Sequence, residues 1–329
     1  MVTLKEVAAA ANVSTVTASS VLSGVNRVRV SPATAERIHR IAKSMNYVPL
    51  AAARGLRTGK TRIIAFVSSS YSKFRADDTW HESLRGVSDL MWEREERLML
   101  VMSRSREHEL EIIRQMAYGR QVDGFIVQNS GGDDEHIDML LRSERPFVIM
   151  GGTPRPDINT VSFDMRSFAA DIAETLQANE CGAVVLLPPP NLDERIYAPF
   201  LEYFANWAQE HGIRRIDWHG AFIPSAQWLA EVKQSLNGKK LGVALLRSLL
   251  PEMVNALESA SLPLGEQSSI VYVSTGEDVI LEPDGLSVMH FDNYTLGRRA
   301  ARLLMSIVDK PKDTPHHPEN LIIPAAQRG

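Results

Sequence analysis

Two hydrophobic patterns follow one another along the chain, and the change falls near residue 63. Before it, apolar side chains recur at the spacing of short helices, and each run is preceded by a residue that can cap a helix. Three short helices, the first two joined by a tight turn, predict a helix-turn-helix module. The caps and runs are Thr3 before 4–11, Ser14 before 15–22, and Ser31-Pro32 before the stripe of Ile38, Ile41, Ala42 and Met45.

From residue 63 onward, short apolar runs alternate with helical stretches of ten or more residues. This alternation predicts parallel sheets covered on both faces, hence an α/β fold. There are too many strands for one compact sheet, so we expect two α/β subdomains with a ligand site in the cleft between them. The expected strands are 63–67, 98–102, 122–127, 147–149, 183–187, 241–246, 270–273 and 321–323, and the clearest helices are 82–94, 107–120, 166–178 and 195–211.

Charge divides the chain at the same place. Residues 1–62 carry ten Lys or Arg against two Glu, a formal charge of +8, whereas the whole chain of 329 residues has −4, which leaves −12 on residues 63–329. A basic module attached to an acidic body is typical of a protein that meets a polyanion through one end. A solvated basic face is the alternative reading of charge alone.

Composition narrows the class of protein further. A single cysteine, Cys181, excludes an intramolecular disulfide and a multi-cysteine metal cluster, and it fits a reducing compartment. No signal-like segment and no apolar run of membrane-spanning length occurs, so we expect a soluble, cytoplasmic protein that does not use a membrane. The sequence predicts no cofactor and no metal.

Residues at the start of the chain match a known pattern in order. They are Thr3-Leu4-Lys5-Glu6-Val7-Ala8, Val13-Ser14-Thr15-Val16-Thr17-Ala18-Ser19, Val21-Leu22-Ser23-Gly24, Tyr47-Val48-Pro49 and 53–61, followed by the looser matches Leu84-Arg85-Gly86, Val122-Asp123-Gly124, Val161-Ser162-Phe163-Asp164 and Gly297-Arg298-Arg299. On these residues the chain resembles the LacI/GalR family of bacterial transcription regulators. The resemblance implies a DNA-binding head at 1–46, a hinge helix and linker at 47–61, and at 62–329 a core like the periplasmic binding proteins, which binds an effector and dimerises.

The second short helix carries groups suited to reading DNA. A recognition helix faces base edges with its N-terminal residues, here Thr15, Val16 and Thr17, whose hydroxyls and methyls suit polar base edges and thymine methyls. Thr3, Ser14 and Ser31 stand at helix starts, where each is a plain cap, a phosphate contact or both. Ser20 occupies a position where the family commonly has an arginine that reads guanine, so an atypical operator is expected. Tyr47 belongs to the same predicted interface.

The segment 50–57 resembles the hinge helix of the family. Eight residues are too few for a helix that is stable alone in water, so ordering on DNA is expected. The resemblance implies that Leu56 wedges between base pairs in the minor groove while Arg54 and Arg57 hold the backbone. A merely flexible linker is the alternative.

The resemblance also implies an effector, a sugar-like molecule or another metabolite, in the core cleft. Several family anchors are absent, since Ser274-Thr275-Gly276 and Arg247-Ser248 stand where acidic and Asn-Asp residues are usual. Phe74 and Asp164 are the strongest candidates because their segments match best. The predicted effector residues are Ser69, Phe74, Asp164, Arg195, Arg247 and Thr275, with Ser70, Trp80, Gln128, Asn129 and His290 as further pocket candidates.

These features favour a homodimeric repressor that binds a palindromic double-stranded DNA operator under the control of a small effector. A regulator with a degenerate core that senses nothing is the first alternative, and activation rather than repression stays open. A solute-binding protein shares the core fold, but it would not carry the basic head. An enzyme is disfavoured because no nucleophile elbow, phosphate loop or metal-ligand spacing occurs.

Overall fold

The computed structural model describes residues 2–22, 28–48, 59–68, 79–103, 105–128, 134–151, 155–187, 194–218, 220, 223–246, 249–274, 283–311, 318–324 and 327–328. Two compact units divide the chain, one of Met1–Arg62 with Arg120–Asp123 and the other of Ile63–Gly119 with Gly124–Gly329. The predicted boundary between residues 46 and 47 lies inside the first unit and stays a prediction.

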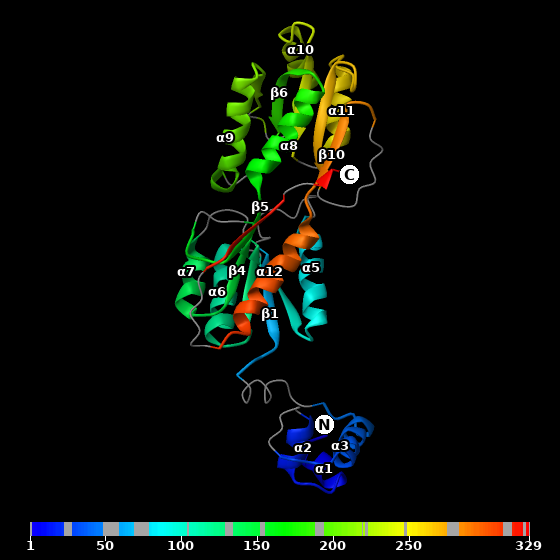
Figure 1. Ribbon diagram of the computed structural model, residues 1–329, viewed down its shortest axis with the longest axis vertical. Coiled ribbons are helices and arrows are strands. Elements are labelled where there is room, and N and C mark those ends of the chain that lie inside the picture. Colours follow the sequence, from blue (N-terminus) through cyan, green and yellow to red (C-terminus); the bar gives the residue numbers. More distant parts are fainter. Residues whose placement is uncertain are drawn as a thin grey trace. The chain divides into compact units, whose positions relative to one another are not determined.

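In its described residues, the first unit holds three helices (Figure 1), which surround a small apolar core. Ala8, Ala11, Ala18 and Ile38 are buried at its centre, and Val13 and other partly buried residues pack around them. Because most of the central side chains are alanines, the short helices approach closely, and the hydrophobic stabilisation of this unit is small. The helices are α1 (Leu4–Ala10), α2 (Thr15–Leu22) and α3 (Pro32–Ser44), close to the predicted runs.

The second unit contains two six-stranded sheets, and the predicted α/β class with two parallel-sheet subdomains is confirmed. The first sheet has the order β11-β5-β4-β3-β1-β2 and is parallel throughout. Its strands are β1 (Ile63–Ser68), β2 (Arg97–Met102), β3 (Gly124–Gln128), β4 (Phe147–Met150), β5 (Thr160–Phe163) and β11 (Asn320–Ile323).

Helices cover the first sheet because its strands are apolar on both faces. Ile64 and Phe66 point to one face, where α5 and α12 pack, while Ala65 and Val67 point to the other face and are equally buried. The helices of this subdomain are α5 (Thr79–Glu93), α6 (Arg106–Tyr118), α7 (Asp134–Ser143) and α12 (Asn293–Val308).

The second sheet has the order β12-β10-β9-β8-β6-β7, in which only the two-residue β12 is antiparallel. Alternate residues of β6 divide between two cores: Val184 and Leu186 face α8 and α9, whereas Ala183 and Val185 face α10 and α11. The elements are β6 (Cys181–Leu187), β7 (Arg214–Asp217), β8 (Lys240–Leu245), β9 (Ser268–Ser274), β10 (Leu286–His290), β12 (Gln327–Arg328), α8 (Met165–Ala178), α9 (Glu194–Glu210), α10 (Ala226–Gln234) and α11 (Leu250–Ser259).

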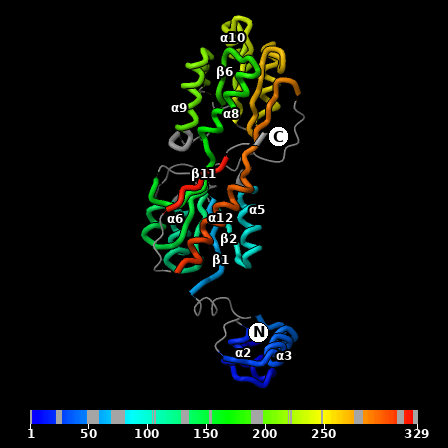
Figure 2. The backbone as a smooth tube through the Cα atoms, viewed as in Figure 1, coloured from blue at the N-terminus to red at the C-terminus, as the bar shows by residue number. Residues whose placement is uncertain are grey.

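The chain passes between the two sheets three times. It leaves the first sheet after β5 to form α8, returns after β10 to form α12, and leaves again between β11 and β12. Figure 2 lets the reader follow these passages along the tube. Each subdomain is therefore built from segments far apart in sequence, and three connections join it to the other. None of the helices in the described part of the chain combines the length and apolar character that a membrane span requires.

Candidate nucleic-acid interface

The first helix of the N-terminal unit begins with a capping box. The Thr3 hydroxyl accepts the Glu6 backbone N–H at 3.3 Å, and the Glu6 carboxylate accepts the Thr3 N–H at 2.7 Å and the Thr3 hydroxyl at 3.0 Å. The backbone and hydroxyl bonds from Thr3 lower the pKa of Glu6. Thr3 therefore performs the capping role, and its exposed position leaves room for the predicted phosphate contact.

The start of α2 is the best candidate for a base-reading surface. The Ser14 side-chain oxygen accepts the Thr17 backbone N–H at 3.1 Å and lies 2.8 Å from the Thr17 hydroxyl, so this pair closes the helix end. Thr15 is exposed and Val16 is 62% exposed, although a valine usually packs inside. One hydroxyl and one exposed aliphatic side chain thus stand together at the N-terminal turn of α2.

Two residues farther along α2 are buried. Ala18 is fully buried, and Ser20 is only 6% exposed. Of the residues predicted to contact DNA and described here, Ser20 has the least surface to offer a base. Its small side chain fits a packed position that a longer one would have to leave.

The third helix presents a basic face. Ser31 caps it by accepting the Thr34 N–H at 3.2 Å, Pro32 occupies the first turn, and Ile38 and Ala42 point into the core. Tyr47 follows the helix and is half-buried, with its N–H bonded to the Ala42 carbonyl at 2.8 Å. The exposed cations of the described head are Lys5, Arg29, Arg37, Arg40 and Lys43.

Several predicted residues lie outside the described part of the chain. They are Arg54, Leu56 and Arg57 with the rest of segment 50–57, and the core candidates Ser69, Ser70, Phe74, Asn129, Arg247 and Thr275. Arg195 and Trp80 lie in the first turns of α9 and α5, but their side chains are not among those described.

Asp164 is the one strong effector candidate whose surroundings are described. It caps α8: one carboxylate oxygen accepts the N–H groups of Arg166 at 3.1 Å and Ser167 at 3.0 Å, and the other accepts the Ser167 hydroxyl at 2.6 Å. The Ser167 hydroxyl is the largest cause that lowers the pKa of Asp164, followed by the backbone N–H groups. The carboxylate stays ionised and half-buried at the passage from β5 to the second sheet.

Two more pocket candidates lie at strand ends. Gln128, the last residue of β3, accepts a bond from the Ser68 hydroxyl at the end of β1, 3.2 Å away. His290 ends β10 and is half-buried. Phe291 follows it, with its ring centroid 4.8 Å from that of Phe163 and 4.6 Å from that of Phe168. Sequence reasoning missed Phe291, although an aromatic residue directly after a strand end was the available signal.

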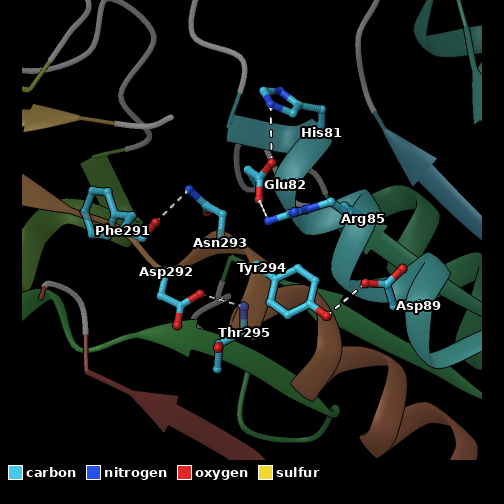
Figure 3. Close-up of polar contacts among 9 residues, drawn as sticks. All are labelled: His81, Glu82, Arg85, Asp89, Phe291, Asp292, Asn293, Tyr294 and Thr295. Carbon is cyan, nitrogen blue, oxygen red and sulfur yellow. Dashed lines mark hydrogen bonds and ion pairs between the residues drawn. The ribbon is translucent and has the colours of Figure 1, made fainter. Parts of the chain in front are cut away.

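The passage from β10 into α12 is held by contacts to α5 (Figure 3). Asp292 caps α12 by accepting the Thr295 N–H at 2.8 Å. The Tyr294 hydroxyl donates to Asp89 at 2.9 Å, and the guanidinium of Arg85 lies 4.8 Å from the centre of the Tyr294 ring. Farther along α12, the Arg298 guanidinium donates two hydrogen bonds of 2.9 and 3.0 Å to the carboxylate of Glu93 at the end of α5. This ion pair lowers the pKa of Glu93 and raises the pKa of Arg298.

Glycines let these two helices approach closely. A Cβ on Gly86 would lie 2.1 Å from the Tyr294 carbonyl oxygen, and one on Gly297 would lie 2.0 Å from that of Ser83. Both glycines belong to segments that carried the family resemblance. Their role in this chain is therefore close backbone packing of α5 on α12.

An apolar strip is exposed at the free edge of the first sheet. Among the strands that the structure describes, β2 pairs only with β1, and its residues Met99, Leu100 and Met102 are exposed, as is Trp92 at 84% near the end of α5. Exposed apolar edges of this kind mark interaction surfaces. Among the described residues, no group of three or more His, Cys, Asp or Glu side chains is arranged to hold a metal ion.

Comparison with known proteins agrees with this organisation. Residues 3–49 match the family model described as bacterial regulatory proteins, lacI family. The regulator MalR of Streptococcus pneumoniae strain TIGR4 is 29% identical over 187 residues, which is 56% of this chain and 56% of MalR. The chain thus spans little more than half the length of that relative. The repressor PurR of Haemophilus influenzae is 26% identical over 93% of this chain and 90% of its own.

Solved structures share the fold of the whole chain. The lac repressor dimer bound to operator and the anti-inducer ONPF aligns over 99% of this chain and 98% of its own, with 18% identity and a TM-score of 0.75. The complex of the regulator CelR with cellobiose covers 100% of both chains at 21% identity and a TM-score of 0.60. At these identities the structural likeness establishes the fold.

Proposed function

We propose that this chain, whose residues 3–49 are a DNA-binding domain of the lacI family of bacterial regulatory proteins, is a cytoplasmic transcriptional regulator that binds a specific operator. The observation that carries the proposal is the N-terminal turn of α2. There the exposed Thr15 and Val16 offer a hydroxyl and methyl groups on a unit whose formal charge is +8. That chemistry fits base edges in a major groove.

In this proposal the head makes two kinds of contact with DNA, one to the bases and one to the phosphates. Thr15, Val16 and Thr17 read bases, whereas the exposed cations near α3, such as Arg37 and Arg40, neutralise phosphates. The N-terminal turns capped by Ser14 and Ser31 add backbone N–H groups, which favour anions. Ser20 is buried, and its part in the proposed interface is that it supplies no long side chain to read a guanine.

The protein acts as a homodimer in this proposal. The exposed apolar residues of β2 with Trp92 offer a strip that a second copy of the chain can cover. A two-fold dimer presents two heads, so the operator is expected to be palindromic. Leu56, Arg54 and Arg57 are assigned to the minor groove from the family resemblance, because they lie outside the described residues.

The ligand class proposed for the core is a small sugar. The regulator CelR, one of the structural neighbours, was solved with cellobiose, and its fold covers the whole of this chain. In this chain the ionised Asp164 stands at a passage between the two sheets, where its carboxylate can accept a sugar hydroxyl. The departures at Arg247 and Thr275 favour a second possibility, a regulator whose core senses no small molecule.

The proposal is tested by selecting randomised double-stranded DNA with the purified full-length chain at a fixed salt concentration. Enrichment of a two-fold symmetric site supports a dimeric, specific regulator. If the protein is well folded but binds all DNA sequences with equal affinity, the result contradicts the proposal. The selected duplex then serves to titrate maltose, cellobiose and glucose, and no effect of any sugar on operator affinity favours the core that does not sense them.

A further inference from the structure

The residues that lead into β1 are bonded to a single carboxylate. One oxygen of Asp123 accepts the Thr61 backbone N–H at 2.7 Å and the Thr61 hydroxyl at 3.0 Å, and the other accepts the Arg62 backbone N–H at 2.8 Å. Thr61 and Asp123 are 62 positions apart in the sequence. Three donors on one ionised acceptor make a strong local contact, because charge-assisted hydrogen bonds are stronger than neutral ones.

This contact lies where the chain enters the first sheet. Thr61 and Arg62 directly precede β1, and Asp123 directly precedes β3, the neighbouring strand, with Ile64 paired to Gly124. The contact therefore lies at the amino ends of two adjacent parallel strands. Their carboxyl ends lead to the segments of the effector candidates Ser69, Phe74 and Asn129.

The chain next to Asp123 cannot shift easily. A Cβ on Gly124 would lie 2.9 Å from a Leu304 methyl and 3.0 Å from the Pro146 carbonyl oxygen, which also accepts the Phe125 N–H at 2.9 Å. On the other side of the contact, Arg62 has a φ of +58°, a left-handed conformation unfavourable for a residue with a side chain. The bond from the Arg62 N–H to Asp123 helps to hold that conformation.

We propose that Asp123 is a positioning residue for DNA binding. It fixes the direction in which the chain leaves β1 toward the hinge segment 50–57 and the head, so that two heads of a dimer meet operator half-sites in register. This inference rests on the proposed function. It assigns a task in that function to a residue of the first compact unit that lies outside both the DNA-contact and the effector candidates.

The test compares Asp123→Asn and Thr61→Val with the wild type and with Glu174→Gln as a control in the full-length chain. Asparagine has one acceptor oxygen, so Asp123→Asn must lose the Arg62 bond or both Thr61 bonds. Thr61→Val removes only the hydroxyl donor. Glu174 is exposed on α8, and Glu174→Gln changes the net charge by the same amount as Asp123→Asn.

The first readout is the affinity for the selected operator and for a scrambled duplex of the same length at equal salt. We expect Asp123→Asn to weaken operator binding about tenfold and Thr61→Val about threefold. Both variants should bind the scrambled duplex with the same affinity as the control Glu174→Gln. The double variant should resemble Asp123→Asn, because both changes remove the same contact. An unchanged operator affinity in Asp123→Asn, or an equal loss on both duplexes, overturns the positioning role.

The second readout does not depend on DNA. Trypsin cleavage after Lys60 and Arg62 requires this segment to leave Asp123, so Asp123→Asn should accelerate cleavage at these two sites about tenfold, as mapped by mass spectrometry. Equal acceleration at all trypsin sites would indicate general destabilisation and overturn the proposal. If the wild-type chain prefers no DNA sequence, the proposed function fails together with the positioning role, while the cleavage rates still report whether Asp123 holds the segment.

Discussion

The N-terminal head and the core use their polar residues in opposite ways. In the head, Thr3, Ser14 and Ser31 cap the helices and also stand where a phosphate can approach. In the core, buried apolar strands make the fold, and most of the polar candidates lie in the connections that follow those strands. A residue of the head thus serves structure and binding together, whereas in the core the two tasks belong to different residues.

This difference explains why a short motif can define the head but not the ligand of the core. A three-helix unit with Ala8, Ala11 and Ala18 at its centre has little hydrophobic area, so its caps are essential to it. The core sheets bury their own apolar strands, and loops that follow such strands generally tolerate sequence change better than the strands themselves. Changes in the core framework should therefore affect stability, and changes in the head should affect recognition.

The largest effect is expected for Gly297→Ala in the core. Alanine usually stabilises a helix interior relative to glycine by about 1 kcal/mol. Here the added Cβ would lie 2.0 Å from the Ser83 carbonyl oxygen, so α5 and α12 must separate. We expect the free energy of unfolding, measured by urea titration, to fall by about 3 kcal/mol.

Arg299→Ala, at an exposed position of the same helix, is the control and should change stability by less than about 0.5 kcal/mol. If Gly297→Ala proved as stable as the wild type, the close approach of α5 and α12 would not be what requires a glycine. The core would then tolerate changes in its framework, and the contrast with the head would weaken.

Leu56→Ala tests the head side of the comparison. The wedge that the resemblance implies requires an apolar side chain to keep base pairs unstacked, so its loss should weaken operator binding about 30-fold. Folding and dimerisation, followed by thermal unfolding and sedimentation, should not change. Val48→Ala, at an exposed position just after the head, should bind like the wild type. Equal affinity of both variants for the operator would remove the wedge.

Much of this fold could be predicted from the sequence because periodicity reports burial. The strands at β1, β2 and β4, and the helices at α6 and α8, lie within a few residues of the expected ranges. The predictions did not list β5 and β10 among the strands, and they failed to identify β7, whose residues Arg214 to Asp217 are mostly polar, and α12, whose apolar stripe was seen only as a matching motif. An exposed edge strand carries no hydrophobic signal.

The site was less predictable than the fold. Capping by Thr3, Ser14 and Ser31 follows from local spacing, and the structure confirms it. The contact of Asp123 with Thr61 joins residues 62 positions apart, and no local pattern encodes such a pair. The burial of Ser20 was equally hidden, because a serine on a short helix fits either face. Which residues bind DNA or effector stays a prediction.

A substitution at Val16 sharpens the claim that the head separates base reading from phosphate binding. Val16→Gln introduces a side chain that pairs with adenine, so the preferred base at one position of each half-site should change by roughly tenfold in affinity. Arg57→Ala should instead weaken all sequences alike and reduce the slope of log affinity against log salt by about 1. Selection of the same motif by Val16→Gln and the wild type would mean that another face of the head reads the bases.

Asp164 is the exception to the comparison, because this core residue caps a helix and is also proposed to bind the effector. Asp164→Ser keeps a capping oxygen, so it should cost at most about 1 kcal/mol of stability at neutral pH. The pKa of Asp164 is lowered from its ordinary value of 3.8, so the ionised carboxylate stabilises the folded state fully above that value. This contribution is lost as the pH falls below 3.8, and urea titrations at a series of pH values should show the free energies of unfolding of the two proteins converging there.

If a sugar shifts operator binding of the wild type but not of Asp164→Ser at neutral pH, the residue serves both tasks. An equal response of both proteins would leave Asp164 a cap alone, and the division between framework and site in the core would then hold without exception.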